Sequence, residues 1–126
     1  MDNGQFSVNQ DGNLITCRPK GAFDMELAVQ YEKNFDQTVK KLNGQNWGLL
    51  SIYNESASAE PAVQQRVWAQ LNWCLHHGCD FMAFVVCNSL QRRLVDEVTK
   101  NLPFKDLQIF QNEDQALNWI KDKLTS

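Results

Sequence analysis

The stretch Phe81-Met82-Ala83-Phe84-Val85-Val86-Cys87 decides the fold, and Asn88-Ser89 and a segment of helical pattern from Leu90 follow it directly. The residues of this stretch are uncharged and largely apolar, without a polar break. A strand with one buried face would alternate apolar and polar residues, so the run predicts a strand that is buried on both faces. A strand, a short turn and a helix form the repeating unit of an α/β sheet with helices on both sides.

Length and charge narrow the class of protein. The chain has 126 residues, a size typical of one domain, and a formal net charge of −3. No basic block exists beyond pairs such as Lys40-Lys41 and Arg92-Arg93. Nucleic-acid binding needs clustered cations, so we expect no nucleic-acid partner. No apolar run approaches the roughly 18 residues of a membrane span, and the first residues do not resemble a signal peptide. We therefore expect a cytoplasmic protein without a transmembrane segment.

The cysteines and histidines do not form a recognisable reactive or metal site. None of the four cysteines stands in a C-x-x-C pair, and we expect all of them to be small apolar fillers: Cys17, Cys74, Cys79 and Cys87. The segment 74–79 holds four potential ligands, but their spacing at a helix end is too tight for a tetrahedral site. We therefore expect no metal and no cofactor.

A Cys-His nucleophilic pair is excluded by distance along the predicted strand. Cys87 ends that strand, while His76 and His77 precede its start. A strand of this length spans roughly 20 Å, so the thiol and the imidazoles cannot meet.

Turn and cap signals divide the rest of the chain into alternating elements. Asp11-Gly12 predicts a β-hairpin over about 5–18. The other predicted elements are a helix from Asp24 to Leu42, a strand over 47–53, a helix from about 61 to 77 capped by Ser58 or a neighbour, a helix from Leu90 to about Asn101, a strand over 107–110 and a final helix capped by Asn112. The order is β-β-α-β-α-β-α-β-α, which predicts a single α/β domain. Its mixed, mostly parallel sheet of about five strands is flanked by four helices.

The helical periodicity assigns buried faces and leaves one tryptophan unexplained. At about 100° per residue, one arc of the helix over 61–77 holds Val63, Val67, Trp68, Leu71, Cys74 and Leu75, and the inner face of the next helix holds Leu90, Leu94, Val95 and Val98. Trp73 lies opposite the first arc. Either a neighbouring element covers Trp73, or it lies in an interface, most simply that of a homodimer.

Polar residues follow each predicted parallel strand, where a binding site is expected in this class of fold. We name this set the strand-end rim: Asn54, Glu55, Ser56, Ser58, Asn88, Ser89, Gln111 and Asn112. Helix N-termini at such an edge can hold an anion. The alternative is that these residues are ordinary helix caps. Glu55 has no histidine partner, so acid–base catalysis is not expected and the chain is not predicted to be an enzyme.

The element order resembles that of STAS domains, the fold of bacterial anti-sigma-factor antagonists, and in particular the SpoIIAA-like group. The resemblance rests on Cys87-Asn88-Ser89 leading to a helix with Arg92 and Arg93, on Leu107-Gln108-Ile109-Phe110, and on the polar turn and Ala-Leu helix over 112–117. It covers most of the chain as topology and implies a regulatory protein-interaction domain that binds a protein partner.

One departure from that family affects the predicted mechanism. Phosphoswitch members carry Asp-Ser-Ser-Gly or Asp-Ser-Thr-Gly after the strand equivalent to 47–53, where this chain has Asn54-Glu55-Ser56-Ala57-Ser58. The missing aspartate and glycine favour serines that cap a helix and bind loop amides over a phosphorylated serine. The likeness of the fold to CRAL-TRIO domains implies an alternative, a small carrier or sensor of a nonpolar ligand, associated with a membrane surface. An apolar pocket beneath the helix over 24–42 would favour the carrier, and a flat rim would favour the interaction domain.

Overall fold

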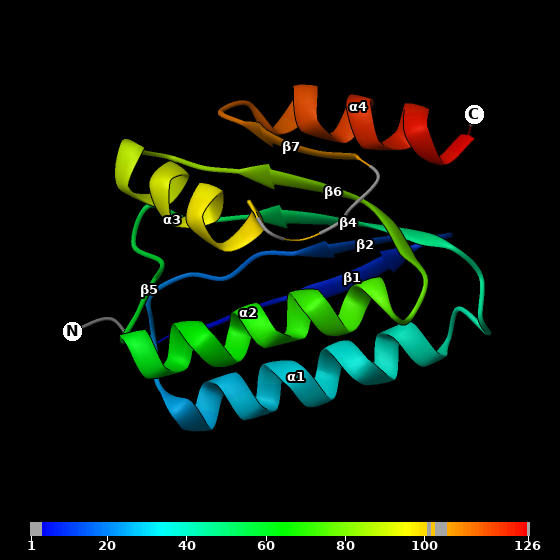
Figure 1. Cartoon of the computed structure of the whole chain (residues 1–126). Helices are drawn as coiled ribbons and strands as arrows, with labels where there is room; N and C mark the ends of the chain where they lie inside the picture. Colours follow the sequence, from blue (N-terminus) through cyan, green and yellow to red (C-terminus); the bar gives the residue numbers. More distant parts are fainter. Residues whose placement is uncertain (1–3, 101, 103–105, 126) are drawn as a thin grey trace.

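A computed structural model describes residues 4–100, 102 and 106–125 (Figure 1). In chain order the elements are β1 (Val8–Asp11), β2 (Leu14–Cys17), β3 (Ala22–Phe23), α1 (Met25–Lys40), β4 (Trp47–Ile52), β5 (Ser58–Ala59), α2 (Pro61–Leu75), β6 (Cys79–Val85), α3 (Ser89–Thr99), β7 (Asp106–Phe110) and α4 (Glu113–Thr125). The predicted order is confirmed, with the short strands β3 and β5 added to it.

The main sheet has five strands in the order β1-β2-β4-β6-β7. β1 pairs antiparallel with β2, while β2, β4, β6 and β7 run parallel to their neighbours. In Figure 1 the arrows of β2, β4 and β6 point to the side where β5 and the start of α3 lie. The carboxyl ends of all four parallel strands therefore share one edge of the sheet.

β6 is buried on both faces, as its apolar run predicts. Met82, Phe84 and Val86 belong to the larger core cluster, and Ala83 and Val85 belong to the smaller one on the other face. The strand begins at Cys79 and ends at Val85, so the predicted bounds of 81–87 were wrong by two residues at each end. Pairing with β4 and β7 makes β6 an interior strand.

The chain adds its parallel strands in one direction across the sheet, and this decides where the helices lie. Crossovers between parallel strands are right-handed, so successive steps in the same direction leave their helices on the same face. Residues of α1, α2 and α3 pack into the larger cluster, whereas α4 alone supplies the helical part of the smaller one. The strand order does not reverse, so the sheet lacks the switch point at which doubly wound folds bind ligands.

Local signals set the ends of α1 as predicted. The Asp24 carboxylate accepts a hydrogen bond of 2.8 Å from the amide of Leu27, which satisfies one of the unpaired donors of the first turn. Asn43 and Gly44 after the helix have φ values of 52° and 80°, a left-handed conformation that ends a helix and favours glycine and asparagine.

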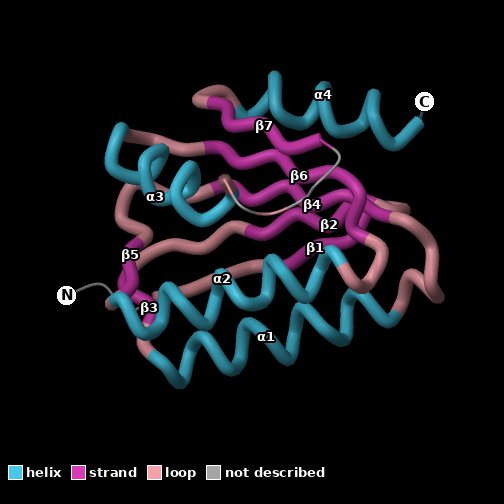
Figure 2. The backbone as a smooth tube through the Cα atoms, in the orientation of Figure 1, coloured by secondary structure: helices cyan, strands magenta, loops and turns pink. Residues whose placement is uncertain are grey.

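The second sheet, β3 with β5, was not predicted. Ala22 and Phe23 pair in parallel with Ser58 and Ala59, and Figure 2 shows this small pair beside the start of α2. Ser58 is therefore in a strand and does not cap α2. The N-cap is Glu60, whose side chain makes no capping hydrogen bond.

Two further assignments from the sequence were wrong. Leu90, expected on the inner face of α3, is 62% exposed. Cys87, expected to be a buried filler, is exposed, while Cys17, Cys74 and Cys79 are buried as expected. Both exposed residues lie just past the end of β6, where the sheet no longer covers the chain.

Candidate functional site

The structure brings the strand-end rim to one edge of the sheet. Asn54, Glu55 and Ser56 follow β4, Asn88 and Ser89 follow β6, and Gln111 and Asn112 follow β7. β4, β6 and β7 are adjacent and parallel, so their carboxyl ends, and the residues after them, lie side by side. Apart from the two-residue strand β5 at Ser58, the rim consists of loop residues and helix starts.

Two asparagines of the rim act as helix caps. The Asn88 side-chain oxygen accepts from the amide of Gln91 at 2.9 Å, and that of Asn112 accepts from the amide of Gln115 at 2.9 Å. Both follow the predicted N-cap pattern. These oxygens stabilise α3 and α4 and are already occupied.

Asn54 and Ser56 order the loop after β4. The Asn54 side-chain oxygen accepts from the Ser56 amide at 2.9 Å and from the Ser56 hydroxyl at 2.7 Å. The Ser56 hydroxyl in turn accepts from the amide of Gly21 at 3.0 Å. Ser56 therefore fixes the loop to the segment before β3, which is the structural role expected from a serine without the phosphoswitch motif.

Gln91 connects two parts of the rim and was missed as a site residue. Its side-chain oxygen accepts from the amide of Cys87 at 2.7 Å, and its side-chain amide donates to the backbone carbonyl of Asn54 at 3.0 Å. The capping-box spacing from Asn88 already marked Gln91 in the sequence, but the link to Asn54 depends on the pairing of β4 with β6.

A shallow groove runs along the edge where β2, β4 and β6 end. Its lining includes Arg18, Lys20, Glu55 and Cys87. Arg18 forms an ion pair with Glu113 at the start of α4. Arg18 and Lys20 lie beside the strand-end rim because β2 is parallel to β4 and ends at the same edge of the sheet. The hairpin signal in the sequence did not reveal this placement.

An exposed apolar side chain and two exposed basic side chains lie close together in the sequence at the start of α3. Leu90 is 62% exposed, and Arg92 and Arg93 are exposed beside it in the sequence. None of the ion pairs among the described residues involves Arg92 or Arg93. The start of α3 therefore presents an apolar side chain and two available cations to solvent.

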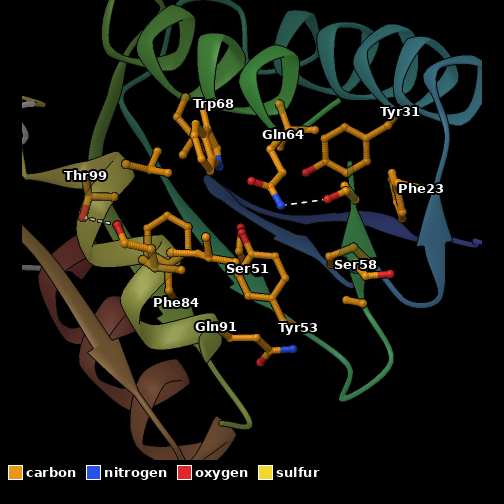
Figure 3. Close-up of a pocket in the computed structure, with 18 residues that line it drawn as sticks. Phe23, Tyr31, Ser51, Tyr53, Ser58, Gln64, Trp68, Phe84, Gln91 and Thr99 are labelled. Carbon is orange, nitrogen blue, oxygen red and sulfur yellow. Dashed lines mark hydrogen bonds between the residues drawn. The ribbon is translucent and has the colours of Figure 1, made fainter. Parts of the chain in front are cut away.

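An apolar pocket of about 130 Å³ lies between α2, α3 and the sheet, and we name it the α2–α3 pocket. α2 contributes Gln64, Trp68 and Leu71, and α3 contributes Gln91 and Val95, with other residues from both helices, the strands β3–β6, α1 and the loops. Figure 3 shows Trp68, Phe84 and Thr99 on one side of the pocket and Tyr31, Gln64 and Ser58 on the other. The pocket lies chiefly between α2 and α3, whereas the expectation placed one beneath α1.

The polar groups of the pocket are uncharged. Burial raises the pKa of the Tyr31 hydroxyl well above 10, and burial also raises the pKa of the Tyr53 hydroxyl. The Tyr31 hydroxyl is hydrogen-bonded to the Cys17 thiol, whose pKa is raised to about 12 by burial. Gln64 donates from its side-chain amide to the carbonyl of Ala59 at 2.7 Å. At physiological pH the hydroxyls are neutral hydrogen-bonding groups.

Ser51 is the pocket residue that the sequence could have revealed. It is the fifth of the six residues of the apolar strand β4, on the same face as Leu49 and Tyr53, and is 5% exposed. Among the described residues, neither the Ser51 nor the Tyr53 hydroxyl has a hydrogen-bond partner. A hydroxyl within a strand buried on both faces is uncommon, and here it faces the pocket.

Packing within the chain accounts for Trp73. The centroid of its ring lies 6.4 Å from that of Phe35 on α1 and 3.9 Å from that of the His77 ring, which is stacked on it. α1 therefore covers this side of α2, which is the first of the two alternatives. An interface or homodimer through Trp73 stays a prediction.

The histidines close the C-terminal end of α2. The Nδ1 atoms of His76 and His77 lie 3.0 and 2.7 Å from the carbonyl oxygens of Asn72 and Trp73. Such contacts satisfy carbonyls of a last helical turn. Among the described residues, no three His, Cys, Asp or Glu side chains are grouped closely enough to hold a metal ion. In the described part of the chain, no helix has the length and apolar character needed to cross a bilayer.

Comparison with known proteins identifies the fold. No protein-family model matches the sequence, and no curated protein matches it. An uncharacterised protein of the DUF3478 family with a SpoIIAA-like fold, from Shewanella loihica PV-4, superposes with a TM-score of 0.69 at 11% identity over 93% of each chain. An anti-sigma factor antagonist from Mycobacterium paratuberculosis superposes with a TM-score of 0.64 at 12% identity, over 95% of this chain and 96% of that one. The chain therefore has the STAS-like, SpoIIAA-like fold that its element order predicts.

Proposed function

We propose that this chain is a non-enzymatic regulatory binding domain that recognises a protein partner through the strand-end rim and the start of α3. The similarity of its fold to that of an anti-sigma factor antagonist supports this class of function. The side chains of Asn54, Ser56, Asn88 and Asn112 in the rim act in helix caps and loop hydrogen bonds. Glu55 has no histidine beside it in the sequence. A surface of this kind binds by shape and charge and lacks the paired groups of acid–base catalysis.

The observation that carries the proposal is the exposure of Leu90 at the end of the sheet. Leu90 is 62% exposed, and it is the more exposed of two exposed large apolar side chains among the described residues, the other being Met25 at 42%. Arg92 and Arg93 follow it on the same helix. Arginine is enriched at the energetic centres of protein interfaces, and the two cations beside an exposed apolar side chain favour a partner surface that is apolar and acidic.

The proposed location is the cytoplasm. Cys87 is an exposed free thiol, and three more cysteines are buried and unpaired. Thiols of this kind persist in a reducing compartment.

Photo-crosslinking in the native cells tests the proposed surface. A photoreactive amino acid replaces Leu90 in one variant and Met25, which is 42% exposed at the start of α1, in the control. We expect one dominant protein adduct from position 90 and none of the same mass from position 25. Adducts of equal yield from both positions, or none from position 90, would contradict the proposed surface.

A second function is favoured by a separate observation, the α2–α3 pocket. An apolar cavity between helices and sheet is the feature that separates a carrier or sensor of a nonpolar molecule from a pure interaction domain. We propose that the pocket holds such a molecule in the cell. Native mass spectrometry of protein purified from its own cells tests this, since a bound molecule adds a discrete mass that disappears on denaturation. The same spectrum measures a phosphate on Ser56 or Ser58 and the mass of a dimer.

A further inference from the structure

The lining of the α2–α3 pocket contains information about the charge of its ligand. None of the described residues that line it is Asp, Glu, Lys, Arg or His. We propose that the pocket takes an uncharged ligand with an apolar body of about six to eight carbons and one neutral hydrogen-bonding group, such as an aliphatic alcohol or a phenol. This proposal rests on the second function proposed above, occupation of the pocket, and specifies the chemistry of the occupant.

The size of the pocket limits the buried part of the ligand. Its volume is about 130 Å³, close to the cavity of about 150 Å³ that holds a benzene molecule in a protein core. Ser58 is exposed, and the other lining residues are buried or half-buried. The pocket therefore meets solvent near Ser58, where a longer ligand would extend outward.

The absence of charge in the lining acts against an ion. A buried ion loses its hydration, and in a protein this loss is offset only by a counter-ion or by several hydrogen bonds. The described lining offers no counter-ion, and burial keeps the tyrosine hydroxyls protonated. A neutral group loses less hydration and needs only one or two partners.

The pocket supplies those partners together with an apolar wall. Trp68, Phe84 and Val95 can contact an apolar body, and Figure 3 shows Trp68 and Phe84 facing the cavity. Ser51 is 5% exposed and lines the pocket, and its hydroxyl has no partner among the described residues. A ligand hydroxyl that forms a hydrogen bond with Ser51 or Tyr53 satisfies both its own hydroxyl and the hydroxyl of the protein. In an unbound pocket, water takes the place of this ligand group.

Four probes of matched size test the inference on the full chain at pH 7. 1-Hexanol and p-cresol are neutral, while hexanoate and hexylammonium carry opposite charges. Methyl NMR spectra follow Leu71, Val95 and Val98, which line the pocket. We expect both neutral probes to shift these methyl signals in a saturable manner, and both ions to need at least ten-fold higher concentrations.

Variants connect the binding to the pocket. Val98→Phe fills the cavity from α3 and should abolish the response to 1-hexanol, while Leu90→Ala on the exposed part of the same helix should retain it. Ser51→Ala keeps the apolar lining and removes the hydroxyl. It should weaken the binding of 1-hexanol several-fold and leave the binding of toluene, which has no polar group, unchanged. This comparison still tests the pocket if Val98→Phe does not fold.

The outcomes separate the two proposals. If hexanoate or hexylammonium binds the pocket as tightly as 1-hexanol, the ligand class is wrong and the function as a carrier stands. If Ser51→Ala weakens the binding of toluene as much as that of 1-hexanol, the role assigned to the Ser51 hydroxyl is wrong. If none of the four probes shifts the pocket methyl signals at millimolar concentration, both the ligand class and the second function are overturned.

Discussion

The side-chain amide of Gln91 donates a hydrogen bond of 3.0 Å to the backbone carbonyl of Asn54, 37 positions earlier in the sequence. The oxygen of the same side chain accepts from the amide of Cys87 at 2.7 Å. One residue thus joins the loop after β4 to the turn after β6. Because Gln91 also lines the α2–α3 pocket, it lies between the two proposed sites.

The first prediction concerns the stability of this junction. Gln91→Ala removes both hydrogen bonds, and we expect it to lower the free energy of unfolding by about 1 to 2 kcal/mol. Gln91→Glu keeps the acceptor for Cys87 and loses the donor to Asn54. Its free energy of unfolding should therefore lie between that of Gln91→Ala and that of wild type. Urea unfolding measures both. Arg92→Ala, one position along, is the control and should change stability by less than about 0.5 kcal/mol. Equal stability of Gln91→Ala and wild type would show that the junction is not a stabilising contact.

The second prediction concerns thiol reactivity. Cys87 is exposed, and Cys17, Cys74 and Cys79 are buried in the core. Iodoacetamide should therefore add one group to the native protein and four to the unfolded protein, as measured by intact mass. Cys87→Ser should abolish the native adduct. Two or more rapid adducts on the folded chain would contradict the placement of the buried cysteines.

The third prediction follows from the raised pKa values in the core. Burial raises the pKa of Cys17 from 9.0 to about 12, and it also raises those of Cys74, Cys79, Tyr31 and Tyr53. A group with a higher pKa in the folded state releases its proton first from the unfolded chain. Its stabilising contribution is complete below the unfolded pKa and is lost as the pH rises toward the folded value.

We therefore expect the free energy of unfolding to fall above about pH 9 for the cysteines and above about pH 10 for the tyrosines, by about 1.4 kcal/mol per pH unit for each such group. Cys17→Ala removes one of these groups and should make the decline between pH 9 and 12 shallower. Urea titrations at several pH values measure the slope, and identical slopes for wild type and Cys17→Ala would refute the effect.

The fourth prediction uses one probe in two charge states. Hexanoate is an anion at pH 7 and is largely converted to neutral hexanoic acid near pH 4, since carboxyl groups of this kind titrate at about 4.3. If the pocket rejects charge, the apparent affinity should rise on the order of 100-fold over this range. 1-Hexanol is the control, since it does not titrate. A similar change for both probes would assign the effect to the protein.

Periodicity and turn signals were sufficient for the fold and for the edge that carries the rim. The apolar run around Phe84 predicted an interior strand, and Asp24, Asn88 and Asn112 act as the caps that their positions predict. These signals are local or depend only on the parallel direction of the strands. The structure therefore follows them closely.

Leu90 shows what periodicity leaves out. Leu90 and Leu94 lie about 40° apart around the helix, so they were assigned to the same inner face. Periodicity gives the angle about the helix axis but not the position along the axis relative to the end of the sheet. Leu90 lies in the first turn of α3, beyond the end of β6, and 62% of it is exposed.

The pocket and the short β3–β5 pair depend on tertiary packing. A two-residue strand has no periodicity to detect, and Ser58 was assigned to a helix cap on residue type alone. The pocket depends on how far α3 lies from α2 across the sheet, a distance that no local pattern specifies. Ser51, a hydroxyl inside an apolar strand, was the available signal.

Calorimetric titration of this chain with the partner protein that is photo-crosslinked from position 90 tests the central claim most directly. It compares wild type with Leu90→Asp and with Met25→Asp, which places the same charge at a second exposed apolar position. We predict that Leu90→Asp weakens binding by at least ten-fold, while Met25→Asp changes it by less than two-fold. Equal affinity of wild type and Leu90→Asp, or an equal loss in both variants, would contradict recognition through the start of α3.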